Sequence, residues 1–124
     1  MTWRGWLSQE QLRKEIDESR VLALPSLWPE PFGLAGTEAR ARARPVAAYD
    51  VGGVREWITG GGIVVARADE PALARAIITL TNDCASWMTY AAGARKHAER
   101  FRVSAHIRRL QDVLAPRAGK GSPP

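Results

Sequence analysis

The chain has 124 residues, of which 45% are hydrophobic and 25% charged, with a formal net charge of +5. This composition is ordinary for a globular protein and argues against a disordered chain or a coiled coil, and the length allows one domain at most. The longest apolar runs, residues 21–24 and 63–66, are far shorter than the roughly 20 residues that span a bilayer. We therefore expect no transmembrane helix. The N-terminus lacks the features of a secretory signal and Cys84 is the single cysteine, which fits a cytoplasmic location.

The positive charge is concentrated in the C-terminal region. Residues 85–124 contain eight Lys and Arg residues and two acidic residues, whereas residues 1–84 contain ten Lys and Arg residues and eleven acidic residues. A solvated helical face with a loose tail is the favoured interpretation, and peripheral contact with the inner face of an anionic membrane is an alternative. Because no nucleic-acid recognition motif accompanies the charge, a nucleic-acid-binding module is a weaker alternative and we expect no specific nucleic-acid partner.

Short apolar runs alternate with helical patterns along the first two thirds of the chain. Most of these runs are continuous, as expected for parallel strands that are covered on both faces. We predict strands over residues 3–7, 21–24, 46–49 and 63–65. We predict a first helix after the capping-box pattern that starts at Ser8, with Leu12 and Ile16 on one face. Further helices are predicted over residues 37–43, over residues 54–58 and from Asp69 onward.

The last third of the chain is predicted to be helical. One helix would carry an apolar stripe that runs from Trp87 to Phe101, and a last helix capped by Ser104 would turn Ile107, Leu110 and Leu114 inward. The alternation of strands and helices predicts an α/β fold, a Rossmann-like doubly wound parallel sheet. We expect residues 1–115 to form this domain and the polar residues 116–124 to form a disordered tail.

Two loops follow predicted strands at the edge where open parallel sheets bind ligands. The first, residues 28–39, combines glycines with the start of a helix, whose free N–H groups and dipole favour an anion such as a diphosphate. It also carries Glu30 and Glu38, whose carboxylates suit a ligand with several hydroxyl groups. The second loop is residues 50–56. The alternative is that Glu30 is a solvated acid and Glu38 only stabilises the start of the helix.

From Trp3 to about Leu114 the chain resembles the C-terminal domain of the family-four glycosyltransferases, which have the GT-B architecture. A lone pair of glutamates eight positions apart would be a weak signal, but the whole collinear series is a strong one. The matching segments are Leu24-Pro25-Ser26, Glu30-Pro31-Phe32-Gly33-Leu34, Glu38-Ala39, Arg44-Pro45-Val46-Ala47-Ala48, Val51-Gly52-Gly53-Val54-Arg55-Glu56, Gly60-Gly61-Gly62-Ile63-Val64-Val65, Asp69 with Leu73, and Arg100-Phe101 followed by Ser104.

The resemblance implies a retaining transferase that binds a nucleoside-diphosphate sugar, such as a UDP- or GDP-hexose, and transfers the hexose to a carbohydrate or lipid acceptor. Glu30 would contact the transferred sugar and position it for catalysis, and Glu38 would contact the ribose. The backbone of Phe32, Gly33 and Leu34 would approach the sugar and the diphosphate. The family implies no bound metal or cofactor. Residues that would line the donor site are Ser26, Trp28, Gly52 and Gly53.

The chain departs from the family pattern in two places. Arg40 to Arg44 stand where the family has small residues and a glycine, and we expect these arginines to form a solvated helix surface. The chain also begins after the strand and basic pair that grip the diphosphate, so we expect a domain truncated at its N-terminus. It is then a fragment, the product of a split or misread gene, or one partner of a two-chain enzyme whose N-terminal domain is a separate chain. His97 and His106 are expected to be ordinary histidines away from both loops. The alternative function is a non-catalytic domain that binds nucleotide weakly or docks on a partner.

Overall fold

A three-stranded parallel sheet forms the centre of the molecule. The computed structural model describes residues 2–115 of the chain. The strands lie in the order β1-β2-β3, and Ala47 of the middle strand pairs with Ala23 on one side and Ile63 on the other. The strands are β1 (Leu22–Leu24), β2 (Val46–Tyr49) and β3 (Gly62–Val65).

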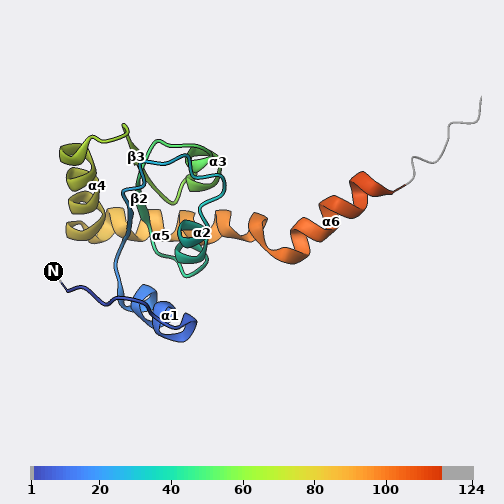
Figure 1. Cartoon of the computed structure of the whole chain (residues 1–124), viewed down its shortest axis with the longest axis horizontal. Helices are drawn as coiled ribbons and strands as arrows, with labels where there is room; N and C mark the ends of the chain where they lie inside the picture. The colour runs from blue at the N-terminus through green and yellow to red at the C-terminus, as the bar shows by residue number, and fades with distance from the viewer. Residues whose placement is uncertain (1, 116–124) are drawn as a thin grey trace, which may run out of the picture.

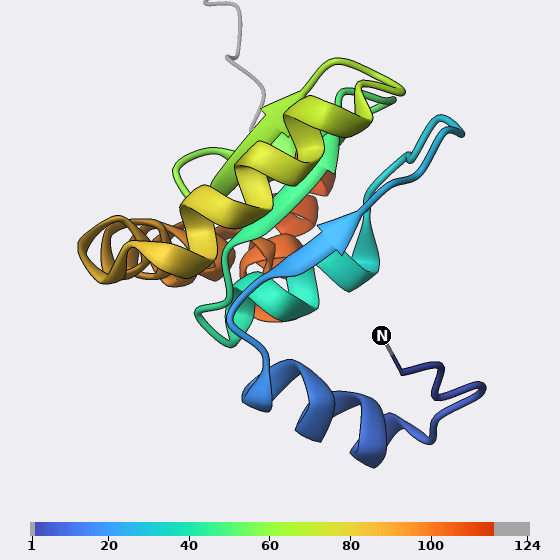
Figure 2. The ribbon, with the colours of Figure 1, turned by 90° about the vertical axis from the view of Figure 1, so that its left-hand side faces the viewer.

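The described part of the chain contains six α-helices and one 3₁₀ helix, some of which cover the two faces of this sheet. They are α1 (Gln9–Glu18), α2 (Leu34–Ala41), α3 (Val54–Ile58), α4 (Glu70–Asn82), α5 (Cys84–Ala98), the 3₁₀ helix η1 (Glu99–Phe101) and α6 (Val103–Leu114). Helix α4 lies on one face of the sheet and α2 on the other (Figure 2). Helix α5 leads through η1 into α6, which extends away from the sheet (Figure 1). The arrangement confirms the predicted α/β fold with a doubly wound, Rossmann-like parallel sheet.

The hydrophobic core is built around β2 and receives residues from α4, α2 and α3. Every residue of β2 is buried, and α4 contributes Leu73, Ala76 and Leu80. Asp69 caps α4 as predicted, because its carboxylate accepts a hydrogen bond of 2.9 Å from the Ala72 N–H. Among residues 2–115, no helix combines the length and the apolar character that a membrane crossing requires.

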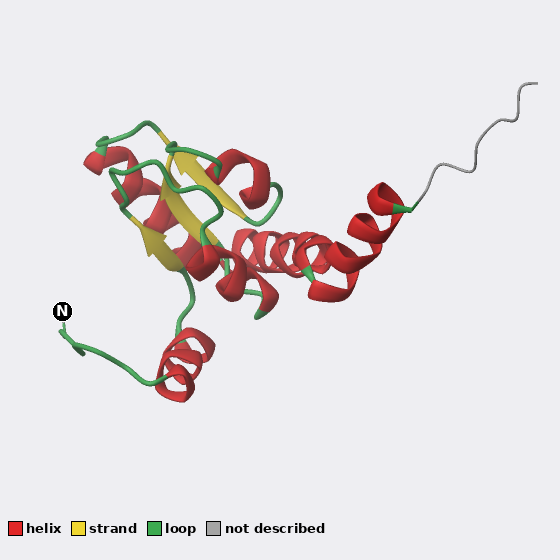
Figure 3. Ribbon diagram, turned by 45° about the vertical axis from the view of Figure 1, so that its right-hand side comes forward, coloured by secondary structure: helices red, strands yellow, loops and turns green. Residues whose placement is uncertain are grey.

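The predicted strand over residues 3–7 is wrong. These residues pair with no strand in the described part of the chain, and the N-terminal segment lies apart from the sheet (Figure 3). Trp3 and Trp6 have exposed fractions of 88% and 102%. An apolar run forms a strand only where a neighbouring strand accepts its hydrogen bonds, and α1 carries this segment away from β1.

Two helix predictions also differ from the structure. Helix α2 begins at Leu34 and ends at Ala41, so it starts three residues before the predicted position at Thr37. The last helix has no buried residue, and its predicted inward face is exposed because α6 runs outward from the sheet. The predicted tail, residues 116–124, lies outside the described residues.

Arginines that follow α2 tie α1 to the rest of the molecule. Arg42 forms an ion pair with Asp17, and Arg44 Nη2 donates a hydrogen bond of 2.6 Å to the Asp17 carbonyl. The Trp87 indole N–H adds a hydrogen bond of 2.7 Å to the Arg20 carbonyl. These contacts place α1 beside the α2–β2 connection, although Ile16 is its single buried residue.

Arg40 is buried, which corrects the prediction that these arginines form a solvated surface. Its exposed fraction is 0%, and its Nη2 donates one hydrogen bond of 3.0 Å to the Thr59 carbonyl. Its Nε and Nη1 atoms are buried without a hydrogen-bond partner. Burial, with the nearby positive charge of Arg100, lowers the pKa of Arg40 to about 10. A buried cation with unpaired donors destabilises the folded state.

Replacement of Arg40 by methionine should therefore stabilise the protein. Arg40→Met keeps most of the side-chain volume and removes the unpaired donors, and we expect the free energy of unfolding to rise by about 1–3 kcal/mol. Urea denaturation measures the change. The matched control is Arg13→Met at an exposed position of α1, which should shift stability by less than about 0.5 kcal/mol. A loss of stability in Arg40→Met would mean that the bond to Thr59 outweighs the cost of burial.

Ala43 ends α2 in a left-handed conformation, with φ of 57°. Its N–H donates to the Arg40 carbonyl and the Arg44 N–H donates to the Ala39 carbonyl, which is the hydrogen-bond pattern of a Schellman motif. Glycine is the usual residue at this position because a Cβ strains the left-handed backbone by roughly 1–2 kcal/mol. The sequence departure before Pro45 thus falls on the residue that most needs to be glycine.

Ala43→Gly should relieve this strain. We expect it to raise the free energy of unfolding by about 0.5–1 kcal/mol, since the gain is partly offset by the greater freedom of glycine in the unfolded chain. Thermal and urea unfolding provide the measurement. Ala41→Gly, an exposed position within the same helix, should lower stability by about 1 kcal/mol. Equal effects in the two variants would contradict the assignment of strain to Ala43.

Candidate functional site

The two predicted ligand-binding loops lie against each other at one edge of the sheet. One follows β1 and the other follows β2, and β1 and β2 are parallel neighbours, so both loops emerge from the same edge. The Gly53 N–H donates a hydrogen bond of 2.9 Å to the Glu30 carbonyl. The sequence prediction that these two segments form one site is consistent with this contact.

Two glycines make this close approach feasible. Gly52 has a φ of +54°, and a Cβ on it would lie 2.6 Å from the backbone N and O atoms of Glu30. A Cβ on Gly53 would lie 2.7 Å from the Pro31 carbonyl oxygen. Any larger residue would push the loops apart. Gly52 also borders a hollow of about 220 Å³, whose other lining residues are Leu27, Pro29, Asp50, Val51 and Arg67.

Helix α2 begins at this site with its N-terminus uncapped by a side chain. Its N-cap residue is Gly33, with φ of 68°. The first intrahelical hydrogen bond joins the Thr37 N–H to the Gly33 carbonyl. The preceding N–H groups and the positive end of the helix dipole therefore remain available to an anion.

The buried side chain of Trp57 packs against the first turn of α2. Its exposed fraction is 2%, and its ring lies against Gly33 and Gly36 so closely that a Cβ on either residue would collide with the indole. A Cβ on Gly33 would lie 2.5 Å from Trp57 Cζ2. Trp57 is thus part of the core beneath the loop, whereas Trp28 at the loop's tip is 82% exposed.

The structure gathers three of the predicted donor-binding residues around a hollow of about 280 Å³. Phe32, Leu34 and Glu38 line it together with residues of α2, α5, η1 and α6. Glu30 is half-buried in the loop and does not line this hollow. Its backbone, and not its side chain, makes the contact with Gly53.

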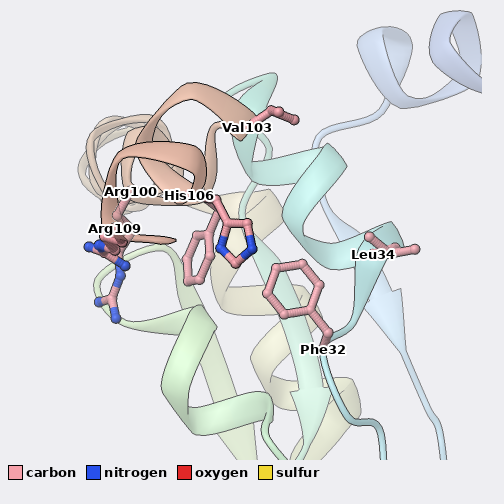
Figure 4. Close-up of a pocket in the computed structure, with 7 residues that line it drawn as sticks. Phe32, Leu34, Arg100, Val103, His106 and Arg109 are labelled. Carbon is pink, nitrogen blue, oxygen red and sulfur yellow. The ribbon is translucent and has the colours of Figure 1, made fainter. Parts of the chain in front are cut away.

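A larger hollow of about 480 Å³ adjoins the same loop and was not foreseen from the sequence. Phe32 and Leu34 form one side and residues of η1 and α6 form the other (Figure 4). The rings of Phe32 and Phe101 meet edge to face, with centroids 5.5 Å apart. The remaining lining residues are Arg100, Val103, His106 and Arg109.

The expectation that His106 lies away from both loops is wrong. It borders this hollow, near Phe32 in Figure 4. The sequence offers only a weak signal for this position of His106, the match of Arg100-Phe101 to the family series. The direction of α6 depends on the extended backbone of Arg102 after η1, which no residue pattern predicts. His97 instead lies beside the Gly60 turn.

Two charged groups of the second loop are paired with each other. Arg55 binds Asp50 through hydrogen bonds and ion-pair contacts of 2.7–2.8 Å, and the Asp50 hydrogen bond raises the pKa of Arg55. This arginine therefore serves the turn before α3. Within residues 2–115, no group of three or more His, Cys, Asp or Glu residues has metal-binding geometry.

The contact between Gly36 and Trp57 can be tested by a double-mutant cycle. Gly36→Ala should destabilise the protein by about 1–3 kcal/mol, because the new Cβ overlaps the Trp57 ring. In a Trp57→Leu background the same change should be neutral or slightly stabilising, since alanine favours a helix. Urea unfolding of the four proteins gives the coupling energy. Additive effects would show that the two residues do not compete for this space.

Comparisons with known proteins identify the family of the chain. The family model described as "Glycosyl transferases group 1" matches residues 1–83. A D-inositol 3-phosphate glycosyltransferase from Streptomyces avermitilis is 36% identical over 101 residues, and the one from Streptosporangium roseum is 39% identical over 109 residues. The alignments cover 80% and 86% of this chain but 22% and 25% of the relatives, so the chain spans about a quarter or less of their length.

Solved glycosyltransferase structures share the fold. Sucrose-phosphate synthase from Thermosynechococcus elongatus superposes with a TM-score of 0.77 at 29% identity, covering 91% of this chain and 30% of that one. TarM superposes with a TM-score of 0.71 at 18% identity, covering 91% and 23%, which shows the fold alone. These neighbours have the GT-B architecture. With the matched family model and the curated relatives, they show that the chain belongs to the group 1 glycosyltransferases.

Proposed function

We propose that this chain is the donor-binding part of a retaining hexosyltransferase that uses a nucleoside-diphosphate sugar. The observation that carries the proposal is the uncapped N-terminus of α2 beside a hollow lined by Leu34, Thr37 and Glu38. The helix end offers N–H groups to a diphosphate, and Glu38 offers a carboxylate to hydroxyl groups one turn further along the helix.

Each predicted residue has a role in this proposal. Glu38 accepts hydrogen bonds from the ribose hydroxyls, and Glu30 accepts them from the transferred sugar and positions it. The backbone of Phe32, Gly33 and Leu34 approaches the sugar and the diphosphate, which the absence of a side chain at Gly33 permits. Ser26, Trp28, Gly52 and Gly53 complete the surroundings of the donor. No metal or cofactor takes part.

In the proposed reaction, the bond between the anomeric carbon and the diphosphate oxygen breaks. The acceptor hydroxyl oxygen forms a new bond on the same face of that carbon, and its proton passes to the leaving diphosphate. Stabilisation of the charge that develops on the diphosphate is the main contribution of the site. The relatives' name points to a phosphorylated cyclitol as one acceptor within the carbohydrate class. A domain outside these 124 residues, on the same or a separate chain, would bind it.

A second candidate function is a non-catalytic domain that docks on a partner chain. The exposed Trp3 and Trp6 favour it, because they border an open hollow of about 570 Å³ with Gly5. Exposed aromatic groups of this kind mark protein contact surfaces. Such a domain would bind nucleotide weakly, and without dependence on Glu38.

Calorimetric titration separates the two functions. The purified chain is titrated with UDP and GDP, and then with their glucose and mannose conjugates. We expect one nucleotide to bind and Glu38→Ala to weaken its binding by about tenfold or more, because the loss of a charge-assisted hydrogen bond costs on the order of 1.5–3 kcal/mol.

The matched control is Glu18→Ala, which removes an exposed carboxylate of α1 that lines none of the hollows beside the two loops. It should leave nucleotide affinity unchanged. Binding that is insensitive to Glu38→Ala, or the absence of binding up to millimolar ligand, would contradict a working donor site in this chain and favour the docking function.

A further inference from the structure

The hollow of about 480 Å³ beside Phe32 has a cationic side. Arg100 from η1 and Arg109 from α6 both line it, and His106 lies between them and Phe32 in the view of Figure 4. None of the described residues that line this hollow is acidic. Leu34, the first residue of α2, borders it as well, so the positive end of that helix lies at its rim.

Arg100 and Arg109 carry positive charges that no acidic residue in the described part of the chain pairs with. Neither takes part in an ion pair within residues 2–115, whereas their neighbour Arg102 is paired with Glu99 at 2.7 Å. Arg100 lies over the Phe101 ring at 5.0 Å, a contact that orients the guanidinium but leaves its charge unpaired. Arg40 adds a buried positive charge near Arg100, which contributes to its own lowered pKa.

The other side of the hollow is apolar and aromatic. Phe32 and Phe101 form a T-shaped pair, and Leu34 and Val103 extend this surface. An arginine pair beside such a wall is suited to a phosphate ester, because the guanidinium groups bind phosphate oxygens in a fork geometry while the ring of the ligand contacts the apolar side.

We propose that Arg100 of η1 and Arg109 of α6, which line a hollow that the first residue of α2 also borders, bind a phosphate group of a substrate of the transferase. The inference rests on the proposed function, because the hollow shares Phe32 and Leu34 with the proposed donor site. The phosphate belongs either to the donor's diphosphate or to a phosphorylated acceptor. Both are phosphate esters or anhydrides, and the same two arginines would bind either one.

The test is calorimetric titration of the full chain at low ionic strength with pyrophosphate, with inositol 3-phosphate, and with UDP and GDP. Arg100→Gln/Arg109→Gln should weaken the binding of a phosphate-bearing probe at least about tenfold. The charge-matched control is Arg95→Gln/Arg108→Gln, which changes two exposed arginines of α5 and α6 that do not line the hollow. It should stay within about twofold of wild type.

The probes identify the source of the phosphate. Loss of UDP or GDP and pyrophosphate binding in the Arg100/Arg109 variant assigns the pair to the donor, and selective loss of inositol 3-phosphate binding assigns it to the acceptor. Both results support the inference. It is overturned if every phosphate probe binds the Arg100/Arg109 variant as tightly as the control variant, or if none binds the wild-type chain at millimolar concentration.

Failure of the donor function gives a different result. Pyrophosphate binding that depends on Arg100 and Arg109 without any nucleotide binding would support the phosphate site and contradict the donor function. Nucleotide binding that depends on Glu38 but not on the arginines would support the donor function and contradict the phosphate site. Thermal unfolding of each variant confirms that it is folded, and the exposed positions of all four arginines make a folding defect unexpected.

Discussion

The contact between the Gly52-Gly53 turn and the backbone of Glu30 and Pro31 holds in place the loop that leads into the proposed donor site. It joins the loop after β1 to the loop after β2 through a main-chain hydrogen bond of 2.9 Å. Glycine is needed at both turn positions because a Cβ would overlap the opposite backbone. From this fixed loop the chain enters α2 through the left-handed Gly33, and Trp57 supports that first turn from the core. The orientation of the helix end, and with it the anion-binding N–H groups, follows from these backbone contacts.

The sheet and its central loops could be predicted because their signals are local. Continuous apolar runs identified β1, β2 and β3, and Asp69 identified the start of α4. The two ligand loops were recognised because parallel strands bring their carboxyl ends to one edge. Glu38 was placed on the first turns of a helix, and the structure puts it beside Phe32 and Leu34.

The parts that could not be predicted depend on contacts between distant segments. Residues 3–7 have the composition of a strand, but strand formation needs a partner that the described chain does not give them. The position of α6 depends on the bend after η1, so the gathering of Arg100, His106 and Arg109 beside Phe32 has no local signature. Arg40 carries a hydrophilic side chain in a buried place, and pattern reasoning assigns such a residue to the surface. Tertiary packing decides each of these cases.

The loop that carries Glu30 is held by its main chain, and this separates the identity of its side chains from the stability of its conformation. The hydrogen bond to Gly53 uses the Glu30 carbonyl, which every amino acid possesses. A substitution at position 30 can therefore change what the loop recognises while the loop keeps its place. Substitutions at Gly52, Gly53 or Gly33 alter the backbone itself. A new ligand preference can therefore evolve through substitution of the glutamates, whereas substitution of the glycines would disrupt the loop.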